Sequence, residues 1–276
     1  MAREIDKLVQ SAPPQTKMKL VIASCSRSGT YGLYNAMKIL GYRPYHMAEA
    51  VRLGIPHMKI LTEAVIAQHD RFSGIKRYAR AEFEKWLAGY DLHLPRRIGD
   101  LRIPNVKFIL TERHASKWVA SMNNTVGGVV TTGSQFPMNI LKRFNPVLWN
   151  LFTLTTVMYR AVAGGTIPGE EGNEEALRRF YVEYIASVKK IVPKERLLVL
   201  KLEDGFGWDE ICPFLEIPIP EEAYPRGNEQ EAFKGAAKGF LKPRIYDAIV
   251  KMGTAVAVFG VVGYLGWRHR MWRVNY

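Results

Sequence analysis

Residues 17–33 read KMKLVIASCSRSGTYGL and carry the pattern that decides the fold. The apolar run at residues 20–23 is typical of a buried strand in a parallel sheet. After a loop of small and hydroxyl residues, apolar side chains recur with helical spacing. These helical positions are Leu33, Ala36, Met37 and Leu40. A strand, a tight loop and a helix start turn free backbone N–H groups and a helix dipole toward one point, which suits a phosphate group.

The loop differs from the phosphate loop of nucleotide hydrolases. That motif needs a glycine, four further residues and then Gly-Lys followed by Ser or Thr. Here Thr30 follows Gly29, and the basic residue Arg27 precedes this glycine by two places. The pattern is a strand followed by a basic residue, one further residue, glycine and threonine. It resembles the loop with which sulfotransferases bind the 5′ phosphate of 3′-phosphoadenosine 5′-phosphosulfate. Taken alone, these residues also fit a serine-rich turn that caps a helix.

A second strand is predicted at residues 105–111, and a helix is predicted to begin near Ala115. Arg113 lies where the strand ends, and Ser121 follows eight residues later. Eight residues are about two helical turns and a cap, so both side chains can reach one phosphate. An arginine fork suits a dianionic phosphate, and serine adds a hydroxyl donor. In sulfotransferases, an arginine and a serine with this spacing bind the 3′ phosphate of the cofactor. A surface arginine at a strand end is the alternative.

Three blocks of the chain resemble, in the same order, a sulfotransferase-like P-loop family abundant in fungi. They are KILGYRPYHM at 38–47, FILTERHASKWVASM at 108–122 and VPKERLLVLKLEDGFGWDEICPFLEIPIPEEAYPRGNE at 192–229. The resemblance covers most of the chain, from residue 17 to 229. It identifies the chain as similar to the superfamily of sulfotransferases that use 3′-phosphoadenosine 5′-phosphosulfate.

The resemblance implies a fold, a reaction and a set of binding residues. We expect an α/β fold, a P-loop-type parallel sheet flanked by helices, with a C-terminal hydrophobic helix. The expected reaction moves a sulfuryl group to a hydroxyl or amine of a small-molecule acceptor, such as a secondary metabolite, without a metal. Arg27 would neutralise charge on the leaving phosphate. Backbone N–H groups would come to the same phosphate from Ser28, Gly29, Thr30 and Tyr31.

Sulfuryl transfer to an alcohol also needs a group that takes up the proton of the acceptor. In sulfotransferases this base is a histidine or a glutamate, in several branches about twenty residues past the loop. His46 and Glu49 lie in that segment, and we expect them to face the same crevice as Arg27. His46 is the first candidate because it titrates near neutrality, and Glu49 is the second. A core histidine that only forms hydrogen bonds is the alternative.

The chain also departs from the usual pattern of this family. Ser24, Ser26 and Tyr31 replace a glycine, a proline and a hydroxyl residue of the loop. Leu94 stands where an aspartate is usual. A second function class therefore stays open, a membrane-attached, catalytically degenerate sulfotransferase-like binding or scaffold protein. A third, a kinase or hydrolase with another phosphate loop, is disfavoured because the loop lacks Gly-Lys.

Length and charge limit the possible partners. A chain of 276 residues fits one α/β domain with a tail. The formal net charge of +13 favours an anionic partner, which could be a nucleic acid, a membrane face or an anionic cofactor. No nucleic-acid-binding motif is visible, so we expect no nucleic acid. Two cysteines, Cys25 and Cys212, predict no disulfide framework and a reducing compartment. The sequence leaves the oligomeric state open.

Other segments predict further elements. A Gly/Thr/Ser-rich stretch at 127–135 is expected to be a loop, serving as a lid or a connection on the substrate side. Another strand is predicted at 196–202. Helices are predicted at 62–68, 75–87, 146–162, 173–192 and 208–215.

The C-terminal stretch 248–267 is apolar except for Lys251 and Thr254. It just reaches the length that crosses a bilayer, about 17 residues or more. Aromatic and arginine residues at its end favour an interfacial anchor, and more basic residues before it than after it favour a cytosolic catalytic domain. A buried core helix is the alternative. The expected layout is an arm at 1–16, the sulfotransferase-like domain at 17–230, a basic linker at 231–247, a single transmembrane helix at 248–267 and a basic tail at 268–276.

Overall fold

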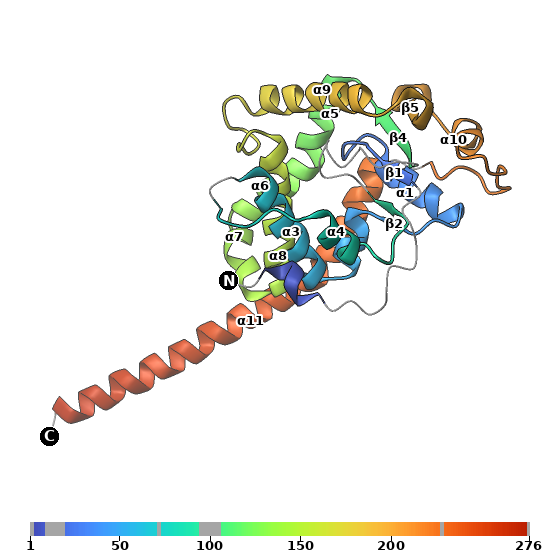
Figure 1. Ribbon diagram of the computed structural model, residues 1–276. Helices are drawn as coiled ribbons and strands as arrows, with labels where there is room; N and C mark the ends of the chain where they lie inside the picture. Colours follow the sequence, from blue (N-terminus) through green and yellow to red (C-terminus); the bar gives the residue numbers. More distant parts are fainter. Residues whose placement is uncertain (1–2, 9–19, 71–72, 94–105, 227–228, 275–276) are drawn as a thin grey trace.

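The computed structural model describes residues 3–8, 20–70, 73–93, 106–226 and 229–274 (Figure 1). Residues 9–19 and Leu94, on which some of the sequence predictions fall, lie outside these ranges. The described chain forms a parallel sheet flanked by helices, and one long C-terminal helix extends away from this body. The predicted α/β fold with a C-terminal apolar helix is therefore confirmed.

Five parallel strands form the sheet, in the order β2-β3-β1-β4-β5. Their bounds are β1 (Leu20–Ile22), β2 (Pro44–Tyr45), β3 (Leu92–His93), β4 (Lys107–Glu112) and β5 (Leu197–Lys201). In the register of the sheet, Val21 pairs with Phe108, and Phe108 pairs with Leu197. Three of the strands, β1, β4 and β5, correspond to the strands predicted at 20–23, 105–111 and 196–202. The sequence did not predict β3, because two residues are too few to show a periodicity.

With this strand order, a crevice is expected at the carboxyl ends of β1 and β4. After β1 the chain runs to β2 on one side of the sheet, and after β4 it runs to β5 on the other side. Open parallel sheets bind ligands between two neighbouring strands whose following connections lead to opposite sides of the sheet. The loop after β1 and Arg113, which follows β4, therefore meet at the position where a ligand is expected.

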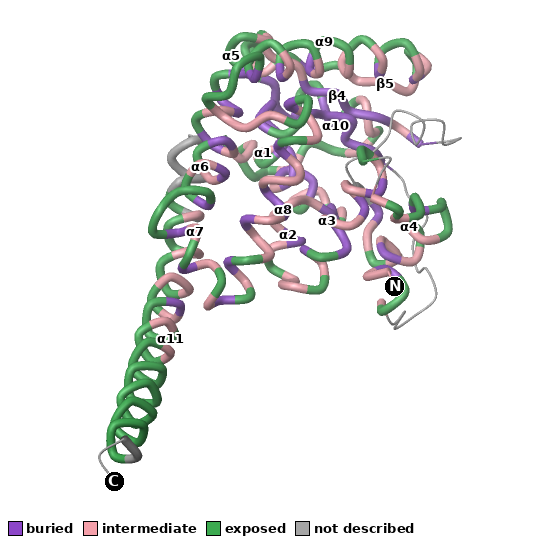
Figure 2. The backbone as a smooth tube through the Cα atoms, turned by 90° about the vertical axis from the view of Figure 1, so that its left-hand side faces the viewer, coloured by how far each residue is buried: buried purple, intermediate pink, exposed green. Residues whose placement is uncertain are grey.

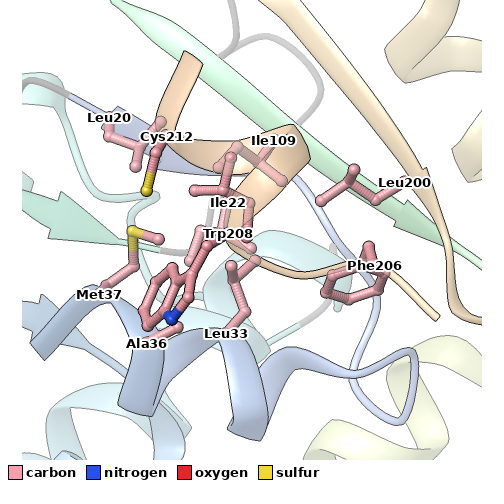
Figure 3. Close-up of a cluster of buried hydrophobic side chains, with 11 residues drawn as sticks. Leu20, Ile22, Leu33, Ala36, Met37, Ile109, Leu200, Phe206, Trp208 and Cys212 are labelled. Atoms are coloured by element: carbon pink, nitrogen blue, oxygen red, sulfur yellow. The ribbon is translucent and has the colours of Figure 1, made fainter. Parts of the chain in front are cut away.

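Helices cover both faces of the sheet. On one face, Leu20 and Ile22 pack against α1 (Thr30–Ile39) and α10 (Trp208–Leu215) (Figure 3). On the other face, Val21 and Ala23 pack with Val188 of α9 (Asn173–Ile191). Successive strand residues point to opposite faces, so a strand covered on both sides is apolar throughout. This explains the run at residues 20–23.

A second group of helices lies beside the sheet. It comprises α2 (Met47–Arg52), α3 (Ile55–His69), α4 (Arg80–Trp86) and α8 (Pro146–Val162). Ile5, in a short 3₁₀ turn at Glu4–Lys7, is buried among these helices with Met58 and Trp86. Arg3 forms an ion pair with Glu82 of α4. The described part of the predicted N-terminal arm is thus packed onto the domain.

The prediction of a loop at 127–135 is wrong. Helical structure continues through α5 (Ala115–Met122), a π-helical turn (Asn123–Gly127) and α6 (Gly128–Ser134). Gly127 and Gly133 allow close packing rather than a turn, because a Cβ atom at Gly127 would lie 2.9 Å from Cγ of Pro168 and one at Gly133 would overlap the ring of Phe152 on α8. Their helical positions are unstrained, so the composition of the stretch alone suggested a loop.

The C-terminal helix α11 (Glu229–Val274) runs without a break through the predicted linker and the predicted transmembrane stretch. Ala248 is buried against α7 (Met138–Leu141) and α8, and the partly buried Ile245 and Met252 pack against the same cluster. Beyond Met252 the apolar side chains are mostly exposed (Figure 2). By length and composition, residues 237–272 could cross a membrane, and only 6% of their most apolar window is buried. This exposure differs from that of a core helix.

Candidate functional site

The loop between β1 and α1 adopts a tight turn. Gly29, the N-cap of α1, has φ of 89°, and Arg27 has φ of 70°. A Cβ atom at Gly29 would lie 3.0 Å from Cδ1 of Leu202, so both the backbone conformation and the available space favour glycine. The first helical bond runs from the N–H of Leu33 to the carbonyl oxygen of Gly29 at 3.1 Å. The N–H groups of the first turn therefore have no partner within the helix.

Two serines tie this loop to β4. Ser24 Oγ accepts a hydrogen bond from the N–H of Thr111 at 2.8 Å. Ser28 Oγ lies 3.0 Å from Thr111 Oγ1 and donates to the carbonyl oxygen of Cys25 at 2.6 Å. All of these groups are buried. The departure from the family pattern at Ser24 thus provides a link between the loop and the neighbouring strand, which a glycine would lack.

The two predicted phosphate sites lie in one hydrogen-bonded network. Arg113 Nη1 donates to the carbonyl oxygen of Arg27 at 3.0 Å, and Arg27 Nε lies 3.4 Å from Ser121 Oγ. The side chains of Arg27 and Ser121 are buried. Two guanidinium groups held at the carboxyl ends of β1 and β4 make this edge of the sheet positively charged.

Arg113 is held by residues that the sequence analysis did not identify. The hydroxyl of Tyr181 accepts from the N–H of Arg113 at 2.9 Å and donates to its carbonyl oxygen at 3.1 Å. Burial raises the pKa of Tyr181 to about 12, so the hydroxyl keeps its proton. Trp118 stacks on Tyr181 with ring centroids 4.6 Å apart and donates from Nε1 to the carbonyl oxygen of Ser26 at 2.8 Å. These aromatic residues position both the arginine and the loop.

A π-helical turn, Asn123–Gly127, begins two residues after Ser121. Within this turn, Thr125 Oγ1 donates to the carbonyl oxygen of Ser121 at 2.5 Å. Single π turns inside α-helices occur often at functional sites, because they change the direction of the neighbouring side chains. Here the turn lies next to the residue that contacts Arg27.

His46 lies near the start of α1. Its ring is the N-cap of α2, where Nδ1 accepts the N–H of Ala48 at 3.1 Å. Its centroid lies 5.1 Å from the ring of Tyr34 and 6.0 Å from that of Tyr31. Burial lowers the pKa of His46 to about 4, so the ring is neutral at pH 7. Because Nδ1 accepts a hydrogen bond, the proton of the neutral ring resides on Nε2.

The carboxylate of Glu49 is already engaged by neighbouring side chains. Tyr34 OH donates to Oε1 at 2.5 Å, and Arg52 Nη2 donates to Oε2 at 2.7 Å. Burial alone would raise the pKa of Glu49, but the hydrogen bonds from Arg52 and Tyr34 hold this pKa below its usual range. The carboxylate is therefore ionised at pH 7 and a weak proton acceptor.

A phosphate-bearing cofactor fits this set of groups. Nε of Arg113 is buried and has no hydrogen-bond partner among the residues that the structure describes. A buried donor left unsatisfied costs about 1–3 kcal/mol, which an anionic acceptor would recover. The N-terminal amides of α1 lie in the same crevice, and helix N-termini favour phosphate groups. Within the described ranges, no group of three or more His, Cys, Asp or Glu residues could hold a metal ion.

Comparison with known proteins agrees with this geometry. The sulfotransferase domain family matches residues 19–233, a range that includes β1, its loop, β4 and β5. The chain belongs to this family. The match ends before the exposed part of α11, so the family domain and the apolar end of the helix are separate regions of this sulfotransferase-family protein.

The sulfotransferase-family chain also has a curated fungal relative. It is similar to Ava biosynthesis cluster protein M of Aspergillus versicolor, with 30% identity over 220 residues. These residues cover 75% of this chain and 80% of the relative. The predicted resemblance to a fungal sulfotransferase-like family is therefore confirmed. Membership of the family supports sulfotransferase-like chemistry on a small-molecule acceptor.

Proposed function

We propose that this chain transfers a sulfuryl group from 3′-phosphoadenosine 5′-phosphosulfate to a hydroxyl or amine of a small molecule. The convergence of Arg27, Arg113 and Ser121 at the carboxyl ends of β1 and β4 carries this proposal. Membership of the sulfotransferase domain family supports it. The fungal relative, whose name refers to a biosynthesis cluster, favours a secondary metabolite as the acceptor.

In this proposal, the loop after β1 binds the 5′ side of the cofactor. When bound, the cofactor supplies the sulfuryl group, and its 5′ phosphate becomes the leaving group. Arg27 neutralises charge that develops on this phosphate. Thr30 adds its hydroxyl, and backbone N–H groups come from Ser28, Gly29, Thr30 and Tyr31. Positioning and charge stabilisation then supply the catalysis, as in phosphoryl transfer.

The 3′ phosphate is assigned to Arg113 and Ser121. The unpartnered Nε of Arg113 is a strong donor for a phosphate oxygen, and charge-assisted hydrogen bonds of this kind are about twice as strong as neutral ones. The hydroxyl of Tyr181 bonds both the N–H and the carbonyl oxygen of Arg113, which keeps the guanidinium group in place without the ligand. Preorganised donors lose less entropy when they bind.

His46 remains the proposed general base, with Glu49 second. Glu49 is disfavoured because Arg52 and Tyr34 already occupy its oxygens. Proton uptake at His46 requires release of the Ala48 contact, because Nε2 carries the proton while Nδ1 caps α2. A His46→Asn variant retains a capping side chain and removes the imidazole. Loss of turnover by about 10²–10⁴-fold with unchanged nucleotide affinity would support general-base catalysis.

We further propose that α11 anchors the chain in a membrane as a single span. The span would use residues 248–267, with 268–276 as a basic tail and the domain at 17–230 in the cytosol. The exposure of apolar side chains beyond Met252 supports this assignment, because a soluble protein rarely exposes so long an apolar surface. The segment at 231–247 would join the span to the domain as a continuous helix.

Turnover with an acceptor mixture tests the proposed reaction. The protein in detergent is incubated with 3′-phosphoadenosine 5′-phosphosulfate and fractions of small-molecule metabolites, and release of 3′-phosphoadenosine 5′-phosphate is followed. We expect one fraction to accelerate release and to yield a sulfated product, and Arg27→Ala to abolish both. If the protein binds 3′-phosphoadenosine 5′-phosphate but no fraction accelerates its release from the sulfated cofactor, a catalytically degenerate binding or scaffold protein would be favoured instead. In that case the hydroxyl of Ser28 would keep its hydrogen bond to the carbonyl oxygen of Cys25.

A further inference from the structure

Three exposed hydrophobic side chains come from the segment where α6 leads into α7 and α8 begins. Phe136 is 79% exposed, Trp149 is 47% exposed and Ile140 is 43% exposed. We call these three residues the corner patch. Large apolar side chains grouped on a surface mark interaction sites more often than isolated ones do. The proposed reaction uses none of these residues.

The corner patch lies next to the place where α11 leaves the domain. Met138 and Leu141 of α7, which flank Ile140, are buried in one cluster with Ala248, and Met252 packs against that cluster. Asn145 Nδ2 donates to Asp247 Oδ2 at 2.7 Å, which joins the start of α8 to α11. In Figures 1 and 2, α7 lies directly beside the end of α11 that contacts the domain. The helices that carry the patch therefore adjoin the segment of α11 that directly precedes its exposed apolar part.

Basic side chains surround this junction. Lys142 Nζ lies 5.9 Å from the ring centroid of Trp149 and donates to the carbonyl oxygen of Gly133 at 2.7 Å. Arg143 is exposed and follows Lys142 in the chain, and α11 contributes Lys251, one helical turn beyond Asp247, with which it forms an ion pair. Tryptophan together with lysine and arginine is typical of the boundary between lipid headgroups and acyl chains. Anionic headgroups attract such a basic surface.

We propose that the corner patch inserts into the headgroup and acyl boundary of the same bilayer that α11 spans. This inference rests on the membrane anchoring in the proposed function. A lipid surface is favoured over a protein partner because the patch adjoins a helix whose next apolar turns would already lie in lipid. The hydrogen bond of Asn145 and the burial of Ala248 hold helix and domain together, so the span would bring the patch to the membrane surface.

This contact would set the orientation of the domain. The sheet lies at the opposite end of the domain from the exposed half of α11 (Figures 1 and 2). With the corner patch in the interface, the crevice at the ends of β1 and β4 stays in the aqueous phase. A water-soluble, multiply charged cofactor could then reach the crevice freely.

Depth-dependent fluorescence quenching tests the proposal on the full chain. Single cysteines replace Phe136 in the patch, Val258 in the span and Val182 on α9, and each is labelled with an NBD fluorophore. Val182 is 52% exposed and serves as the aqueous control. The native Cys25 and Cys212 are buried and should not react in the folded protein. The labelled proteins are reconstituted into phosphatidylcholine and phosphatidylserine vesicles that carry a nitroxide either near the headgroup or deep in the acyl chain.

The three positions separate the possible outcomes. We expect the label at 136 to be quenched several-fold more by the shallow nitroxide than by the deep one, the label at 258 to be quenched more by the deep one, and the label at 182 by neither. A label at 136 that behaves like 182 while 258 is quenched would overturn the inference and leave the anchor intact. A blue-shifted but unquenched label at 136 would point to a protein contact and also overturn it. An unquenched label at 258 would overturn the anchor itself, and the inference with it.

Discussion

Replacing Arg113 with alanine is expected to weaken the binding of 3′-phosphoadenosine 5′-phosphate by about 10- to 150-fold. The proposed contact is a charge-assisted hydrogen bond from the buried, unpartnered Nε to the 3′ phosphate. Hydrogen bonds to charged groups contribute about 1.5–3 kcal/mol. Since about 1.4 kcal/mol changes Kd tenfold, the expected range follows directly.

Isothermal titration of the variant with two nucleotides separates this contact from a general disturbance. Arg113 Nη1 also donates to the carbonyl oxygen of Arg27, so its removal could distort the loop that binds the 5′ phosphate. Adenosine 5′-phosphate lacks the 3′ phosphate, and its affinity should change little in Arg113→Ala. Arg160→Ala, which removes an exposed arginine of α8, is the matched control and should alter neither affinity. Unchanged affinity for the bisphosphate, or an equal loss for both nucleotides, would refute the assignment.

Four further variants test other parts of the proposed structure and function. Gly133→Ala should lower the free energy of unfolding by about 1–3 kcal/mol, because the added Cβ atom would overlap Phe152. Gly128→Ala has open space around its Cβ position and should be neutral or slightly stabilising. Denaturant unfolding in detergent measures both changes. His46 has a folded pKa of about 4 and an unfolded pKa near 6.5, so the unfolded chain binds more protons in this window and stability should fall as pH drops from about 6.5 to 4. His46→Asn should remove that slope, and an unchanged slope would contradict the assignment. Deletion of 253–276 retains Met252 and the packed part of α11, and should move the protein from the membrane to the soluble fraction while it stays folded; aggregation of this shorter chain would contradict the proposed span.

Local patterns predicted the centre of the fold. The apolar run at residues 20–23 indicated a strand because helices cover both of its faces, and the spacing from Leu33 to Leu40 indicated α1 because its buried side forms a stripe. Arg113 follows β4 directly and Ser121 lies about two turns into the next helix, so their spacing indicated that both lie at one edge of the sheet. The predictions of the strand and the helix succeeded because each depends on neighbours in the sequence, whereas the assignment of Arg113 and Ser121 to one phosphate stays a prediction.

The remaining features depend on contacts between distant parts of the chain. Tyr181 holds Arg113 from 68 residues away, and Ser24 bonds Thr111 from 87 residues away, so no local pattern indicates them. The stretch at 127–135 was predicted as a loop because glycine usually marks turns, yet Gly133 is required by the ring of Phe152 on another helix. A glycine that permits close packing and a glycine in a turn look the same in the sequence.

Calorimetric titration of the wild-type protein with 3′-phosphoadenosine 5′-phosphate and with ATP tests the central claim most directly. We expect saturable binding of the bisphosphate at one site per chain and much weaker binding of ATP, because Arg113 and Ser121 would receive a 3′ phosphate that ATP lacks. Binding of ATP that equals or exceeds that of the bisphosphate, or no binding of the bisphosphate, would contradict it.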